Sequence, residues 1–209
     1  MKTIYLHGFA SGPLSRKAQF FRQRFEERGL ALEIPALDEG DFEGLTISGQ
    51  LKLVERIACS EPVTLIGSSM GGYVAALYAA RHPEGARLVM LAPAFYFPRR
   101  WMETLEPEKA AAWQRDGKMG VFHYSEGRMR DIGYQLVRDA EGYEPAPNVK
   151  QPVLLFHGLK DDVVPAGYSK EFAAAHPENV KLRLLDSGHE LTDVLDLIWQ
   201  ESESFLIHW

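Results

Sequence analysis

The chain has 209 residues, 45% of them apolar, and a formal charge of −6 with a pI near 5.7. This length and composition predict one domain with a sizeable core, and the acidic balance argues against nucleic acid or an anionic membrane as an obligate partner. Cys59 is the only cysteine, which excludes an intrachain disulfide, and no apolar run is long enough to span a membrane.

The first residues enter a strand pattern directly, without the apolar stretch of an export signal or the Arg-rich pattern of an organelle presequence. We therefore expect a cytoplasmic protein. Cys59 falls late in a predicted helix, where we expect a small core residue rather than a nucleophile. Nothing in the sequence indicates the oligomeric state.

Short apolar runs alternate with helical patterns along the chain. The runs predict six strands, at 4–7, 31–35, 63–67, 87–92, 153–157 and 180–185. Ser15 is a candidate N-cap for a first helix that Gly29 ends. Further helices are expected over 51–58, 70–81, 166–176 and 191–205. Strands buried on both faces and joined by helices are typical of an α/β fold, here with about six mostly parallel strands.

The segment 95–148 separates the fourth and fifth predicted strands and is far longer than one crossover helix requires. It predicts a small helical cap inserted within a single domain over 1–209. We expect this cap to lie above the carboxyl ends of the strands, where ligands bind in such sheets. Phe95, Trp101 and Trp113 are candidate substrate-binding residues in this cap. The alternative is that the cap aromatics only pack the cap against the body.

The most informative motif is Gly67-Ser-Ser69-Met-Gly71, which follows four apolar or β-branched residues and precedes a helical pattern. This context predicts a sharp, strained strand-to-helix turn that lifts the Ser69 hydroxyl clear of the backbone. A side chain at Gly67 or Gly71 would collide with the neighbouring strand or helix in so tight a turn. Ser69 is therefore the candidate nucleophile.

A serine nucleophile needs an adjacent base, usually a histidine oriented by a carboxylate. Of seven histidines, His189 lies in the loop after the last predicted strand, and Asp161 and Asp162 follow the strand before it. Residue type, chain order and placement at strand ends together predict a Ser69, Asp161, His189 triad. Adjacent loop residues point in different directions, so one aspartate should reach His189; we favour Asp161 and leave Asp162 as the alternative.

Acyl transfer also needs two preorganised N–H donors for the developing oxyanion. The backbone N–H of Met70, directly after the candidate nucleophile, is one expected donor. The backbone N–H of Phe9, in the loop that Gly8 opens after the first strand, is the other. We expect His7 to hold this loop by hydrogen bonds rather than to act as a base.

These motifs resemble the α/β-hydrolase family over nearly the whole chain, in compact form. The matching stretches are Tyr5-Leu-His-Gly8, Gly67-Ser-Ser-Met-Gly-Gly72, His157-Gly-Leu-Lys-Asp-Asp-Val-Val-Pro165 and Gly188-His189. The chain is most similar to the acyl-protein thioesterase and acyl-glucuronide esterase branch, through the elbow, the loop around Asp161 and His123-Tyr-Ser-Glu-Gly127. It is also similar to small bacterial esterases that open with Tyr-Leu-His-Gly-Phe.

The resemblance implies a serine hydrolase that cleaves ester or thioester bonds of small to medium apolar acyl substrates through an acyl-enzyme. No metal or organic cofactor is expected, because the sequence has neither metal-ligand His/Cys spacing nor a Gly-rich phosphate loop. The alternative is a small-molecule receptor on the same scaffold with little turnover. Peptidase or lyase chemistry on the same triad is a related alternative, and a peptidase is less favoured because so small a cap leaves little room for a long peptide groove.

Overall fold

Five parallel strands form the central sheet of the computed structural model, which describes residues 2–85 and 87–207. The strand order is β1-β2-β3-β6-β7, and every neighbouring pair is parallel. The bounds are β1 (Lys2–Leu6), β2 (Val63–Ser68), β3 (Arg87–Leu91), β6 (Val153–Gly158) and β7 (Val180–Leu185). Because the strands run in one direction, all their carboxyl ends meet at the same edge of the sheet.

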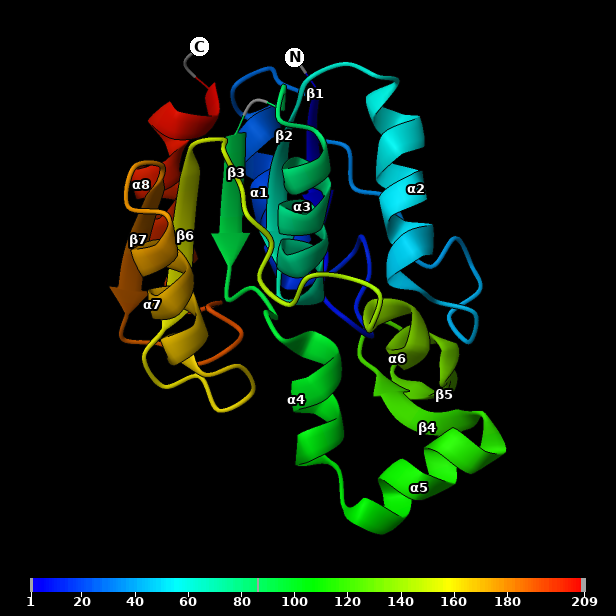
Figure 1. Ribbon diagram of the computed structural model, residues 1–209. Helices are drawn as coiled ribbons and strands as arrows, with labels where there is room; N and C mark the ends of the chain where they lie inside the picture. The colour runs from blue at the N-terminus through cyan, green and yellow to red at the C-terminus, as the bar shows by residue number, and fades with distance from the viewer. Residues whose placement is uncertain (1, 86, 208–209) are drawn as a thin grey trace.

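Helices cover both faces of this sheet (Figure 1). One face packs against α1 (Arg16–Glu26) and α8 (Leu195–Ile207) through an apolar cluster that includes Phe21, Phe156 and Trp199. The other face packs against α2 (Ile47–Ala58), α3 (Met70–Arg81) and α7 (Ala166–Ala175). Burial on both faces explains why the strands read as continuous apolar runs in the sequence.

The segment between β3 and β6 lies beyond the carboxyl ends of the strands (Figure 1). It consists of α4 (Phe97–Thr104), α5 (Pro107–Asp116), β4 (Lys118–His123), β5 (Arg128–Gly133) and α6 (Gln135–Ala140). The β4 and β5 strands pair antiparallel as a separate two-stranded sheet. The prediction of a purely helical segment was therefore wrong, because one part of it is a hairpin.

Two further sequence predictions need correction. The predicted strand at 31–35 is only an isolated bridge, in which Glu33 pairs with Ile4. Pro35 has no N–H with which to extend that ladder, so the sheet has five strands rather than six. Cys59 is exposed rather than part of the core, because it ends α2 in the left-handed region with φ 54°.

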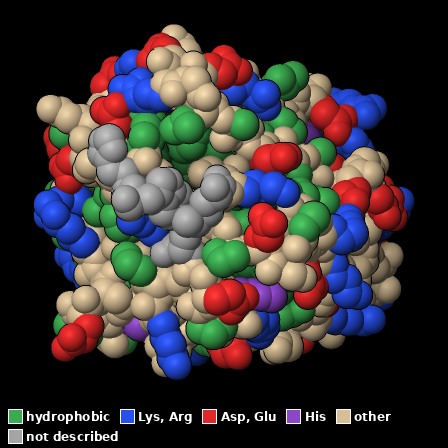
Figure 2. All heavy atoms as spheres, turned by 90° about the horizontal axis from the view of Figure 1, so that it is seen from above, with side chains coloured by type: hydrophobic (Ala, Val, Ile, Leu, Met, Phe, Trp, Pro, Cys, Tyr) green, Lys and Arg blue, Asp and Glu red, His purple; other side chains and the backbone are tan. Residues whose placement is uncertain are grey.

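The end of the sheet remote from the inserted segment carries intermingled basic and acidic side chains (Figure 2). Among the residues that the structure describes, no helix combines the length and the apolar character needed to cross a membrane.

Candidate active site

Ser69 occupies a strained turn between β2 and α3. Its backbone has φ 53° and ψ −117°, in the positive-φ region that a residue with a side chain rarely adopts. A Cβ added to Gly67 would lie 2.4 Å from the Gly71 carbonyl oxygen, and one added to Gly71 would lie 2.2 Å from the Leu6 carbonyl oxygen. The two glycines are thus required by close backbone approach, as the motif predicted.

The structure brings Ser69, His189 and Asp161 together at the carboxyl edge of the sheet. The Ser69 hydroxyl donates to His189 Nε2 at 3.0 Å, and His189 Nδ1 donates to Asp161 Oδ2 at 2.7 Å. The three residues follow β2, β7 and β6 respectively, so parallel strands deliver them to one place. Asp162 is exposed, and no hydrogen bond joins it to His189 within the described residues.

The side chain of Asp161 is fully buried and held on both carboxylate oxygens. Its Oδ1 accepts from the backbone N–H groups of Val163, at 2.9 Å, and Val164, at 2.7 Å. Burial raises the pKa of this carboxyl, but hydrogen bonds from His157, His189 and Val164 outweigh burial and hold the pKa well below its usual range. Asp161 is therefore an anion aimed at the imidazole of His189.

A second imidazole supports the same carboxylate. His157 is fully buried, and its Nε2 lies 3.1 Å from Asp161 Oδ2 and 2.9 Å from the Val164 carbonyl oxygen. Ser169, also buried, donates its hydroxyl to His157 Nδ1 at 2.7 Å. This arrangement makes Nε2 of His157 the protonated nitrogen, shared between two acceptors. The contact between His157 and Asp161 was not predicted from the sequence, although His157 directly precedes Gly158 in the loop motif.

Phe9 and Met70, which carry the two predicted oxyanion donors, line the same cavity as Ser69. Within the described part of the chain, neither the Phe9 nor the Met70 backbone N–H donates to another protein group. His7 holds the preceding loop, because its Nε2 accepts from the Leu37 N–H at 3.3 Å and its Nδ1 contacts the Gly8 carbonyl oxygen at 3.0 Å. Burial lowers the pKa of His7, which favours the neutral ring that these contacts require.

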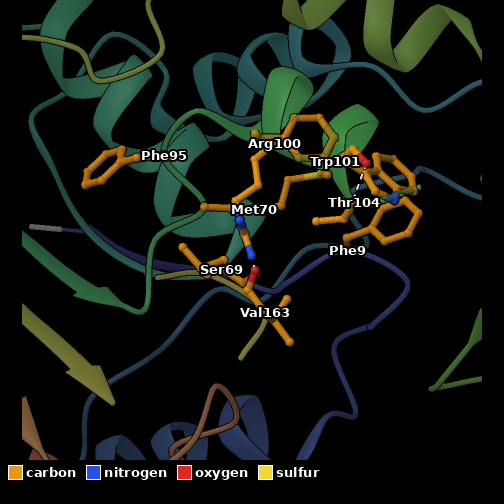
Figure 3. Close-up of a pocket in the computed structure, with 11 residues that line it drawn as sticks. Phe9, Ser69, Met70, Phe95, Arg100, Trp101, Thr104 and Val163 are labelled. Carbon is orange, nitrogen blue, oxygen red and sulfur yellow. Dashed lines mark hydrogen bonds between the residues drawn. The ribbon is translucent and has the colours of Figure 1, made fainter. Parts of the chain in front are cut away.

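A cavity of about 160 Å³ opens on one side of Ser69 (Figure 3). Phe9, Arg100, Trp101 and Val163 line it. Phe95 is also among its lining residues, but its ring points away from Ser69 and stacks on Phe172, with centroids 4.4 Å apart. Trp113 is not on the wall. It is buried behind Trp101, with ring centroids 4.7 Å apart, and its Nε1 donates to the Ile132 carbonyl oxygen at 3.0 Å.

A wider groove of about 860 Å³ meets the cavity at Ser69. His189 lines this groove but not the cavity. Lys17 of α1 also lines it and donates to the carbonyl oxygen of Glu190 at 2.8 Å, which ties the loop that carries His189 to the first helix. Burial lowers the pKa of Lys17, and Glu190 opposes that shift.

The described residues hold no cluster of three or more His, Cys, Asp or Glu side chains arranged to bind a metal ion. The polar groups around Ser69 are instead arranged as one chain of hydrogen bonds with two free amide donors beside it. Such a chain can move a proton between a hydroxyl and an imidazole and can stabilise an adjacent oxyanion.

Comparisons with known proteins agree with this fold. The chain is 32% identical over 142 residues to the mitochondrial palmitoyl-protein thioesterase ABHD10 of Bos taurus, covering 61% of this chain and 44% of that protein. It thus spans less than half the length of this relative. It is 25% identical to the AB hydrolase superfamily protein YisY of Bacillus subtilis, covering 89% of this chain and 84% of that protein.

Solved structures are similar over nearly the whole chain. Mouse alpha/beta hydrolase domain-containing protein 10 superposes with a TM-score of 0.81 at 22% identity, covering 98% of this chain and 88% of that one. Est1E from Butyrivibrio proteoclasticus, solved with ferulic acid bound, has a TM-score of 0.79 at 22% identity, covering 98% of this chain and 87% of that one.

Residues 2–205 match the family described as "Uncharacterised protein family (UPF0227)". The match covers almost the entire chain, including the turn at Ser69 and the loops of Asp161 and His189. The protein therefore belongs to the UPF0227 family, and its fold is that of the α/β-hydrolase superfamily.

Proposed function

We propose that this protein is a serine hydrolase that cleaves carboxylic esters or thioesters through an acyl-enzyme. The observation that carries the proposal is the hydrogen-bonded series from Ser69 through His189 to Asp161, next to the free amides of Phe9 and Met70. The thioesterase and esterase names of its relatives support the same chemistry. We also propose that the segment 95–148 is a cap over this site.

In the first half-reaction, Ser69 Oγ attacks the acyl carbonyl carbon while its proton passes to His189 Nε2. The carbonyl electron pair moves onto oxygen, where the Phe9 and Met70 amides stabilise it. Collapse of this intermediate breaks the bond to the leaving oxygen or sulfur, which takes the proton from His189. The product is an acyl group joined to Ser69 and a free alcohol or thiol.

In the second half-reaction, water takes the place of the leaving group. The water oxygen attacks the acyl carbon while His189 accepts a proton from the water. His189 then returns this proton to Ser69 Oγ as the carboxylic acid departs. Asp161 holds Nδ1 of His189 protonated throughout, so that Nε2 is the nitrogen that exchanges protons. The hydrogen bonds from His157 and from the Val163 and Val164 amides keep Asp161 in place for this task.

The cavity and the groove divide the substrate between them. A general acid must lie within hydrogen-bonding reach of the leaving atom. His189 lines the groove and does not line the cavity. The groove therefore receives the leaving group, and the cavity receives the acyl group. A cavity near 160 Å³ is close to the volume of about 150 Å³ that binds benzene in an engineered apolar site. We therefore propose a short acyl or an aryl group.

The decisive experiment compares wild type with Ser69→Ala on p-nitrophenyl esters from acetyl to palmitoyl and on one acyl-thioester. Loss of the nucleophile from a working triad lowers kcat by about six orders of magnitude, so we expect activity in wild type and none in the variant. A wild type that turns over no ester or thioester but binds such ligands tightly would favour the receptor alternative.

Trp101→Ala tests the acyl cavity. Because this indole forms part of the wall, its removal should shift the preferred p-nitrophenyl ester toward longer acyl chains. Trp113→Ala is the matched control for loss of an indole that supports the wall from behind. An unchanged chain-length preference in Trp101→Ala would refute the assignment of this cavity to the acyl group.

A further inference from the structure

Arg100 is a cationic side chain in the wall of the otherwise largely apolar cavity. It lies on α4, and its Nε donates to the Val163 carbonyl oxygen at 3.0 Å. In Figure 3 its side chain extends toward Ser69 and Val163. Arg100 thus presents its remaining N–H donors close to the candidate nucleophile.

The guanidinium of Arg100 makes no ion pair with a carboxylate in the part of the chain that the structure describes. Its neighbour Arg99 differs, because Arg99 is exposed and its Nε pairs with Glu103 at 2.8 Å. Arg100 as a residue is half-buried, and a planar anion can bind its guanidinium through two parallel hydrogen bonds. Arginine is the residue best shaped to bind a planar carboxylate in this way.

The position of Arg100 indicates which part of a substrate carries the anion. Arg100 lines the cavity and not the groove, whereas His189 lines the groove and not the cavity. This step rests on the proposed function, because it assigns the acyl group to the cavity from the need of His189 to protonate the leaving atom.

We propose that Arg100 binds a carboxylate on the acyl group, so that the preferred substrates are monoesters or monothioesters of short dicarboxylic acids. The aromatic walls formed by Phe9 and Trp101 contact the methylene groups of such an acyl chain. Arg100 neutralises the far carboxylate and acts as a specificity-determining residue.

Carbon-matched esters test this proposal with one leaving group. The monoethyl esters of succinic, glutaric and adipic acids are compared with ethyl butanoate, pentanoate and hexanoate, by the acid released at constant pH. Wild type should show a higher kcat/KM for the charged member of at least one pair. Hydrogen bonds to charged groups contribute about 1.5–3 kcal/mol, which corresponds to a factor of roughly ten to one hundred and fifty.

Arg100→Gln should therefore lower the ratio of charged to neutral kcat/KM by about ten- to one hundred and fiftyfold. Arg99→Gln removes the same charge from the adjacent residue, outside the cavity, and should leave the ratio as in wild type. An equal loss on both esters of a pair in Arg100→Gln would overturn the proposal, because Arg100 would then act only through the Val163 loop. A wild type that prefers the neutral esters would also overturn it.

Binding without turnover separates this proposal from the proposed function. Thermal shifts are measured for Ser69→Ala, alone and combined with Arg100→Gln, in monoethyl adipate and in ethyl hexanoate. A shift with the charged ester that Arg100→Gln abolishes supports the anion site even if wild type hydrolyses nothing, in which case only the hydrolase proposal fails. Equal shifts with both ligands, or none, would refute the anion site.

Discussion

Gly71→Ala is the sharpest structural test of the turn that carries Ser69. An added Cβ would lie 2.2 Å from the Leu6 carbonyl oxygen and 2.5 Å from that of His7. Ordinary contact begins near 3.4 Å, so β1 and α3 would have to separate by about 1.2 Å. Both obstacles are backbone atoms, so no side chain can rotate away to relieve the contact.

The displaced strand carries the oxyanion loop, because Phe9 follows His7 by two residues. Overpacking of this kind typically costs about 1–3 kcal/mol, which lowers Tm by roughly 2–12 °C in a chain of this length. A misplacement of about 1 Å in the reacting geometry can lower the rate about 10²-fold. Gly71→Ala should therefore lower the stability of the fold and also lower kcat by at least about 10²-fold.

The assays are differential scanning fluorimetry and p-nitrophenyl ester hydrolysis, with Gly167→Ala as the matched control. Gly167 lies in α7, and an added Cβ there meets nothing within 4 Å. The same substitution should leave kcat unchanged and stabilise the protein by about 0.4–1 kcal/mol. A Gly71→Ala variant with the Tm and kcat of wild type would refute the close approach of α3 to β1.

Three more predictions concern the residues around His189 and the oxyanion loop. Asp161→Asn should lower kcat by about 10⁴-fold, whereas the exposed Asp162→Asn should hydrolyse p-nitrophenyl esters at close to the wild-type rate; equal losses would contradict our assignment. Ser169→Ala leaves Nδ1 of the buried His157 without its donor. It should lower the free energy of unfolding, measured with urea, by about 1–3 kcal/mol. An unchanged urea midpoint would count against a stabilising role for the hydrogen bond from Ser169 to His157. Burial lowers the pKa of His7, so below about pH 6.5 the unfolded chain binds a proton that the folded chain does not, and stability falls as the pH drops. His7→Gln should make the plot of Tm against pH flatter between 5 and about 6.5, and an unchanged slope would exclude this contribution.

Several errors of sequence interpretation share one physical cause. The run at 31–35 has an apolar pattern, yet within the described residues its one bridge to the sheet pairs Glu33 with Ile4, in the middle of β1. The β4/β5 hairpin was missed because most of its residues are exposed or only half-buried, so the two strands lack the continuous apolar runs that mark the strands of the central sheet. Whether an exposed segment pairs depends on what lies beside it, and a local pattern does not contain that information.

The contributions of Arg100 and His157 were also invisible in the sequence. An arginine on a short charged helix is ordinarily solvated, and only the packing of α4 over the carboxyl ends of the strands brings Arg100 to the cavity. His157 lies at the end of a buried strand, where a histidine is usually a satisfied core residue. Its contact with Asp161 Oδ2 depends on the turn that folds the loop back onto β6.

The sequence by itself determined the features that depend on local geometry and chain order. The glycines around Ser69 predict the strained turn, because no other residue allows such close backbone approach, and alternating apolar strands and helices predict a parallel sheet. Since parallel strands end at one edge, the order of Ser69, Asp161 and His189 predicts their meeting. Tertiary structure alone decided the supports of Asp161, the division between cavity and groove, and the position of Arg100. These depend on contacts between residues far apart in the chain, whose distances follow from packing and not from any local pattern.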